Sequence, residues 1–288
     1  MDNRMQGKIC VITGGTSGIG KATAAGLAQM GATVVIVGRN QEKGNAVLDE
    51  IQDASGNNAL AFLLADLSSQ ASIRQLAAEI QQRYAHLDVL INNAGVFMLR
   101  RQTTVDGLEV TFAVNHLAAF LLTNLLLDLL KASAPVRIIH VDSDSHEKAT
   151  IRMNDLQGEK NYRFWHAYGQ SKLAMLLCSY ELARRLEGTG VSVNALHPGF
   201  VATSMGMNNV GAIGRAVAGA VLPLLGMTPE DGAKTSLYLA SSPEVADVSG
   251  RYFVKSVPVR SAPLSYDETL QRQMWAASEK LVGLAVAP

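Results

Sequence analysis

The chain has 288 residues, of which 48% are hydrophobic and 17% charged, which provides a large core and excludes an intrinsically disordered protein. Its 25 basic residues balance 25 acidic ones without a block of like charge, so no nucleic-acid partner is expected. Cys10 and Cys178 lie inside apolar runs and not in paired or metal-ligand spacings, which predicts reduced core thiols, typical of a cytoplasmic protein.

Short β-branched runs alternate with longer helical patterns, an order typical of repeated βαβ units. The expected strands are residues 8–13, 33–38, 59–65, 89–91, 136–141 and 191–196, several of them apolar almost throughout. Helical spacing of apolar residues marks 22–30, 72–84 and 167–186. Because continuous apolar strands need cover on both faces, the pattern predicts an α/β fold with a Rossmann-type doubly wound parallel sheet.

Two segments, 144–165 and 200–227, break this rhythm just after the ends of expected strands, where ligands bind in open α/β sheets. We expect them to form a small substrate-binding lobe within one domain, 1–288. The apolar stretches 118–130 and 210–226 are interrupted by polar residues and too short to span a bilayer, and no export signal precedes the first strand. These features predict a cytoplasmic location without a transmembrane segment.

A glycine-rich turn, TGGTSGIG at residues 13–20, joins the first expected strand to the first helix. Glycines there allow a tight turn and close approach of a pyrophosphate, and the helix N-terminus offers free N–H groups to the anion. In this context the turn predicts a dinucleotide site made by Gly14, Thr16, Ser17, Gly18, Ile19 and Gly20.

The second expected strand ends in Gly38-Arg39, about 20 residues on, where an NAD site usually carries an acid. Arg39 could instead pair with a 2′-phosphate, and Gly38 would leave room for it, which predicts NADP(H) in preference to NAD(H). Alternatively, Arg39 is a solvated surface charge.

Further motifs follow in a characteristic order: Asp66-Leu67, Asn92-Asn93-Ala94-Gly95, Asn115-His116-Leu117, Tyr168 to Lys172, and His197-Pro198-Gly199 with Thr203. With the glycine turn they resemble the short-chain dehydrogenase/reductase family over nearly the whole chain, in its retinol dehydrogenase and WW-domain oxidoreductase-like branch. The resemblance implies cofactor contacts by Asp66, Leu67, Asn93, Ala94, Gly95, Pro198, Gly199 and Thr203, and a water-ordering role for Asn115. Alternatively, Asn115 kinks or caps a helix.

Tyr168 and Lys172 are four residues apart, a spacing that places both on one face of a helix. A nearby ammonium and a nicotinamide cation both favour the phenolate, so Lys172 is expected to lower the pKa of Tyr168 as well as to bind the cofactor with it. Tyr168 would act as general acid and base.

The turn after the fifth expected strand, Val141-Asp142-Ser143-Asp144-Ser145-His146, lies where the family places a catalytic serine. Ser143 is the candidate and Ser145 the alternative. The branch usually has two serines here, and Asp142 replaces the first. Such a carboxylate could alter the local field or recognise a polar substrate. His146 is expected in the pocket or at the surface.

These residues predict an NADP(H)-dependent oxidoreductase that interconverts a carbonyl and an alcohol, with the substrate oxygen between Ser143 and Tyr168. The alternatives are a catalytically silent NADP-binding regulatory or scaffold protein, and an epimerase or enone reductase. Phe97, Met98, Phe164, Trp165 and Met205 suggest an apolar substrate, although they could equally serve packing. The six histidines form no compact ligand set, so no metal is expected. By the resemblance, residues 167–186 could form a homodimer.

Overall fold

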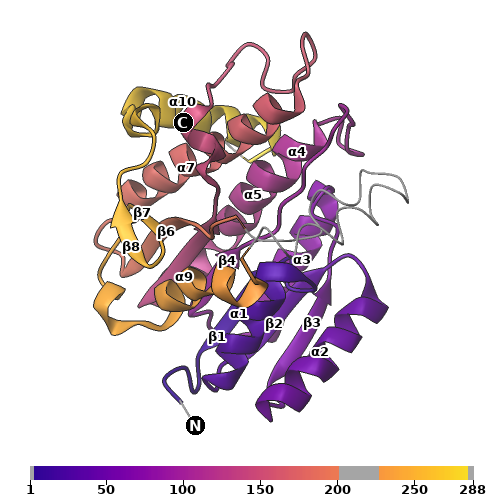
Figure 1. Ribbon diagram of the computed structural model, residues 1–288, viewed down its shortest axis with the longest axis vertical. Helices are drawn as coiled ribbons and strands as arrows, with labels where there is room; N and C mark the ends of the chain where they lie inside the picture. Colours follow the sequence, from indigo (N-terminus) through magenta and orange to yellow (C-terminus); the bar gives the residue numbers. More distant parts are fainter. Residues whose placement is uncertain (1–2, 201–226, 285–288) are drawn as a thin grey trace.

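The computed structural model describes residues 3–200 and 227–284 and contains an eight-stranded sheet in the order β3-β2-β1-β4-β5-β6-β7-β8 (Figure 1). β1 to β7 are parallel, and β8 runs antiparallel to β7. The strands are β1 (Ile9–Thr13), β2 (Thr33–Gly38), β3 (Leu60–Leu64), β4 (Val89–Asn92), β5 (Val136–Val141), β6 (Val191–His197), β7 (Arg251–Val254) and β8 (Val257–Val259). The order from β3 to β6 is that of a doubly wound nucleotide-binding sheet, which confirms the predicted fold class.

Helices cover both faces of the sheet. One face packs against α1 (Gly18–Gln29), α2 (Gln41–Ser55) and α9 (Pro229–Ser241), and the other against α3 (Gln70–Arg83), α5 (Ala118–Leu125) and α7 (Phe164–Arg185). In β2, Val34 and Ile36 join the first core, whereas Val35 and Val37 join the second. Alternate side chains of one strand are therefore buried on opposite faces, which explains why the strand is apolar without interruption.

The remaining elements are shorter or lie late in the chain. They are α4 (Val110–Phe112), the π-helix η1 (Ala113–Leu117), α6 (Leu127–Ala132), α10 (Glu268–Leu281), and the 3₁₀ turns η2 (Asp144–Lys148), η4 (Pro243–Val245) and η5 (Pro263–Tyr266). The sequence patterns locate the first six strands to within one residue at each end, but they do not identify the helices α2, α4, α5, α6, α9 and α10 or the strands β7 and β8.

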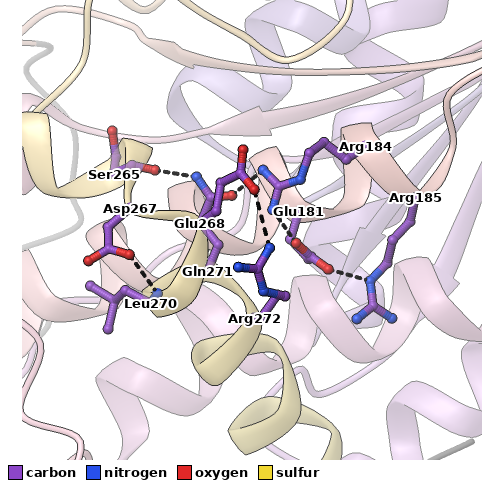
Figure 2. A network of polar contacts seen from close by, with 9 residues as sticks. All are labelled: Glu181, Arg184, Arg185, Ser265, Asp267, Glu268, Leu270, Gln271 and Arg272. Carbon is purple, nitrogen blue, oxygen red and sulfur yellow. Dashed lines mark hydrogen bonds and ion pairs between the residues drawn. The ribbon is translucent and has the colours of Figure 1, made fainter.

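α10 packs against α7 on the far side from the sheet (Figure 1). Arg184 of α7 pairs with Glu181 and donates to Gln271 of α10, and Figure 2 shows this contact among its neighbours. Trp275 of α10 lies edge-on to Phe120 of α5, with ring centroids 4.7 Å apart.

α7 is consequently enclosed along its centre, and every residue from Gly169 to Leu182 is buried within the chain. Residues 167–186 are the stretch expected to form a homodimer. Between Gly169 and Leu182 this stretch has no exposed side chain that a second copy could contact. Within the described ranges no helix is long and apolar enough to cross a membrane, and Cys10 and Cys178 are buried free thiols.

Candidate active site

The residues singled out in the sequence gather at one edge of the sheet, because the carboxyl ends of parallel strands all meet there. Gly14 follows β1, Arg39 follows β2, Asn93 follows β4, Ser143 lies two residues beyond β5, and Pro198 follows β6. α7 brings Tyr168 and Lys172 to the same edge.

The turn between β1 and α1 has the shape that a bound phosphate requires. Gly14 and Gly18 have positive φ angles of 68° and 53°, which residues other than glycine rarely adopt. A Cβ on Gly20 would lie 2.4 Å from both the Asn93 amide nitrogen and the Gly14 carbonyl oxygen, so only glycine allows this approach.

The N-terminus of α1 is also suited to an anion. Ser17 precedes the helix but makes no side-chain cap, and the first turn has no acidic residue. In contrast, Asn40 caps α2 and Ser69 caps α3 through their side chains. The first N–H groups of α1 therefore have no side-chain acceptor from Ser17, and the predicted residues of this turn, Ile19 among them, fit a dinucleotide pyrophosphate.

Asn93 fastens this cradle to the neighbouring strand. Its side chain donates to the Thr13 carbonyl at 2.8 Å, and its backbone N–H and that of Ala94 donate to the Thr13 hydroxyl at 3.0 and 3.1 Å. Asp66 accepts two hydrogen bonds from Ser68, at 2.9 and 2.8 Å, and so shapes the turn after β3. Leu67 and Gly95 are half-buried beside these loops.

The end of β2 lies directly against the glycine turn. A Cβ on Gly38 would lie 2.8 Å from the Thr16 methyl group, which shows how closely the two loops approach. The next residue, Arg39, is exposed. A cation therefore occupies the place at which the sequence predicts recognition of the 2′ position.

The side chain of Ser143 lies close enough to the phenol of Tyr168 to lower its pKa. Burial outweighs this effect and raises the pKa of Tyr168 to about 12, and the negative charges of Asp142 and Asp144 raise it further. Among the chain's own groups burial therefore outweighs the other influences on this pKa, and the lowering expected from a nicotinamide cation stays a prediction.

Lys172 lies on the same face of α7 as Tyr168, with Nζ 5.9 Å from the centroid of the phenol ring. This nitrogen donates to the carbonyl of Val141 at 2.8 Å, and burial lowers the lysine pKa while Asp142 opposes that shift. An ammonium has three donors, so two remain for other acceptors such as ribose hydroxyls.

Asn115 is buried in the π-helix η1, an element often found at functional sites. Its carbonyl oxygen accepts from the Val96 N–H at 2.7 Å, and its amide nitrogen donates to the Val96 carbonyl and to the Ser171 hydroxyl, both at 3.0 Å. The side chain therefore links the loop after β4 to the helix of Tyr168 and does not cap a helix end.

In the turn after β5, Ser143 Oγ donates to Asp144 at 3.2 Å and accepts from the Ser145 N–H at 3.2 Å. Ser145 Oγ is buried without a hydrogen-bond partner in the described residues, so the geometry favours Ser143 as the serine that meets Tyr168.

The expectation that His146 lies in the pocket or at the surface is wrong, since it is fully buried. Its Nδ1 is 2.6 Å from the Ser143 carbonyl oxygen, and Nε2 accepts from the Ala262 N–H at 3.2 Å. His146 thus supports the peptide of Ser143. The two lie three residues apart in one 3₁₀ turn, a spacing that could have indicated the contact.

Aromatic side chains stand beside the phenol. The ring of Phe97 is 5.5 Å from that of Tyr168 and 5.2 Å from those of both Phe164 and Trp165. Trp165 is 70% exposed, so this wall opens to solvent. Met98, another predicted pocket residue, is half-buried in the same loop as Phe97.

Pro198 and Gly199 continue from β6 toward the site, Gly199 with a positive φ of 88°. Thr203 and Met205, and nearly all of the predicted 200–227 segment, lie outside the described residues. Within the described part of the chain no three His, Cys, Asp or Glu residues form a group that could hold a metal ion.

Comparison with known proteins agrees with this geometry. The family model for short chain dehydrogenase matches residues 8–212. Retinol dehydrogenase 14 of Homo sapiens is 44% identical over 294 residues, covering 97% of this chain and 88% of that protein. Retinol dehydrogenase 13 of Homo sapiens is 44% identical over 282 residues, covering 96% and 85%.

Solved structures are similar as well. An uncharacterised protein from Mycobacterium paratuberculosis has a TM-score of 0.78 and 31% identity, covering 97% of this chain and 94% of that one. A short-chain dehydrogenase from Escherichia coli complexed with NADPH has a TM-score of 0.70 and 26% identity, covering 89% and 100%. The chain belongs to the short-chain dehydrogenase/reductase family, in its retinol dehydrogenase branch.

Proposed function

We propose that this protein is an NADP(H)-dependent oxidoreductase that interconverts an apolar aldehyde or ketone and the corresponding alcohol. The observation that carries the proposal is that Lys172, on the same helix face as Tyr168, is bonded to the end of the strand that leads to Ser143, at the edge of the sheet that also holds the glycine cradle. Both hydroxyls can then reach one substrate oxygen.

The cofactor would lie along the turn of residues 14–20, with Arg39 at its 2′-phosphate and Lys172 at a ribose. When bound, NADPH supplies the hydride for reduction. A 2′-phosphate suits Arg39 because a guanidinium forms charge-assisted and often bidentate bonds to phosphate, whereas NAD would leave the cation without a counterpart. The solved NADPH complex of a family member supports use of this cofactor class.

In reduction, Tyr168 donates its phenolic proton to the substrate oxygen while Ser143 donates a hydrogen bond to the same atom. Both bonds strengthen as that oxygen gains negative charge, so the pair stabilises the transition state more than the ground state. In oxidation Tyr168 takes the proton back. The raised pKa keeps the phenol protonated at neutral pH, which suits the donor role.

An apolar substrate is supported by the wall of Phe97, Phe164 and Trp165 beside the phenol, because such rings bind apolar surface well. The similarity to proteins named retinol dehydrogenase agrees with a long apolar alcohol or aldehyde.

The decisive experiment offers NADPH deuterated at the transferable position together with nonanal, benzaldehyde, acetophenone or all-trans-retinal, with NADH as the control cofactor. We expect NADPH consumption and deuterium on the carbon of the product alcohol. Binding of NADPH without turnover of any carbonyl would favour the regulatory alternative. Label at a carbon–carbon double bond of all-trans-retinal would favour the enone reductase.

A further inference from the structure

Asp142 is a buried carboxylate between β5 and the catalytic turn, at a position where the family branch usually has serine. Its backbone N–H donates to the Leu196 carbonyl at 2.7 Å, which holds it to β6. Its Oδ1 accepts the backbone N–H of Ser143 at 2.9 Å. The residue is only 3% exposed, so this bond forms out of contact with bulk water.

The second oxygen of this carboxylate has no hydrogen-bond partner among the described residues. The hydroxyl of Tyr252, also buried, likewise lacks one. Burying a charge without full compensation is costly, and a serine would avoid the cost. A carboxylate kept here therefore calls for a role that a neutral side chain does not fill.

Charged and titratable groups of several elements interact electrostatically with Asp142. They are Lys172, Tyr168 and Tyr180 from α7, His146 and Asp144 from η2, and Tyr252 from β7. Lys172 is bonded to the carbonyl of the preceding residue, Val141, so its ammonium is held at the last residue of β5 and the carboxylate belongs to the next residue. The Asp142 carboxylate therefore acts on both members of the Tyr-x-x-x-Lys pair.

We propose that Asp142 is a positioning residue that fixes the backbone of Ser143 and, as a buried negative charge, extends to higher pH the range in which Tyr168 can donate its proton. The proposal rests on the carbonyl reduction proposed above. Two physical effects are distinct here: the Oδ1 bond orients the serine, and the charge opposes formation of a second anion, the phenolate, nearby.

The titration directions agree with the geometry. Burial raises the pKa of Asp142 to about 6, with Lys172 opposing, so the carboxyl is ionised at neutral and alkaline pH. Its charge then raises the pKa of Tyr168. Asp144 acts in the same direction, but its side chain is 65% exposed and its field is screened by solvent.

The test compares Asp142→Asn with wild type in the pH dependence of kcat/KM for reduction of the most reactive carbonyl of the panel by NADPH. Asparagine keeps an acceptor for the Ser143 N–H and removes the charge. We expect the alkaline decline of the reduction rate to begin about one pH unit lower in this variant. Asp144→Asn, the exposed comparison, should shift the decline by less.

Asp142→Ala removes both the charge and the acceptor. It should show the same shift and, in addition, a fall in kcat on the order of tenfold because Ser143 is no longer oriented. It also serves as the second variant if Asp142→Asn does not fold. Thermal unfolding and NADPH binding by fluorescence establish that each variant is folded.

Three results would overturn the inference. If wild type reduces a carbonyl and the alkaline decline of kcat/KM begins at the same pH in the folded Asp142 variants, Asp142 does not act on Tyr168. If Asp144→Asn shifts the decline as much as Asp142→Asn, the buried position has no special effect. If wild type reduces no carbonyl, the proposed function fails, and this inference fails with it.

Discussion

The ammonium group of Lys172 donates a hydrogen bond to the carbonyl oxygen of Val141 at 2.8 Å. Val141 ends β5, which leads directly to Ser143, whereas Lys172 shares a helix face with Tyr168. One buried bond therefore sets the distance between the strand that carries the serine and the helix that carries the tyrosine. The two hydroxyls that we propose to meet one substrate oxygen are thus held in register by a third side chain.

Replacing the phenol should separate chemistry from binding. In Tyr168→Phe we expect carbonyl reduction to fall by about 10²- to 10⁴-fold, because the proton donor is lost. NADPH affinity should stay close to wild type, since the ring and its contact with Phe97 remain. Steady-state kinetics and fluorescence titration measure the two quantities.

The matched control is Tyr162→Phe. Tyr162 is another partly buried tyrosine, with its pKa also raised to about 12, whose hydroxyl donates to the Met98 carbonyl at 2.7 Å. It should retain most turnover. Comparable losses in both variants would assign the effect to packing and not to proton transfer.

Cofactor preference should follow the charge at residue 39. In Arg39→Asp we expect the ratio of kcat/KM for NADPH to that for NADH to fall by about ten- to a hundredfold, because a carboxylate repels the 2′-phosphate that a guanidinium binds. Kinetics with both cofactors measure it. Lys131→Asp, an exposed substitution in α6, serves as control. An unchanged ratio in Arg39→Asp would show that Arg39 is a solvated surface charge.

The buried histidines should make stability depend on pH. Burial lowers the pKa of His140 to about 4 and that of His116 to about 3. The contribution of these neutral histidines to the free energy of unfolding is therefore complete above the unfolded pKa of about 6.5. It is lost as pH falls, because the unfolded chain binds protons that the folded chain excludes.

We expect His140→Phe to reduce the pH dependence of the free energy of unfolding between pH 6 and 4.5 by up to about 1.4 kcal/mol per pH unit. Urea unfolding at several pH values measures it. His86→Gln is the control, because the side chain of His86 is 47% exposed. Identical slopes for wild type and His140→Phe would contradict the expectation.

The docking of α10 should account for a measurable part of the stability. Trp275 is 3% exposed, packs on Phe120, and has the guanidinium of Arg185 4.2 Å from its ring centroid. We expect Trp275→Ala to lower the free energy of unfolding by about 3 kcal/mol or more. Arg272→Ala removes only an exposed ion pair with Glu268 and should change it by less than about 1 kcal/mol. Equal effects in urea unfolding would show that α10 is not docked as described.

Local features of the site were predictable because they depend on short spacings. The glycine turn lies between a strand and a helix, and four residues separate Tyr168 from Lys172 along one helix face. The direction of the Tyr168 pKa was not predictable in this way, because it depends on burial by segments far apart in the chain. The same holds for His146, whose partner Ala262 is 116 residues away.

The missing elements of the fold have a similar explanation. β8 has three residues, all exposed, and so lacks the apolar run by which the inner strands are recognised. α10 is rich in polar residues, and the few it buries include Gln271 and Ser278. Ser278 lies against the α7 face, and its Oγ is 2.7 Å from Nε2 of His116. The spacing of hydrophobic residues does not reveal such a polar contact.

The π-helical turn at Ala113–Leu117 restricts how this stretch can change in length. A π turn contains one residue more than the α turns on either side, so deleting a residue would let regular α geometry continue through it. Each side chain of α5 would then rotate by about 100° relative to Asn115. The deletion would therefore break either the ring contact between Phe120 and Trp275 or the hydrogen bond between Asn115 and Ser171. Substitutions here can be absorbed locally, but a single-residue deletion forces a choice between the core and the catalytic edge.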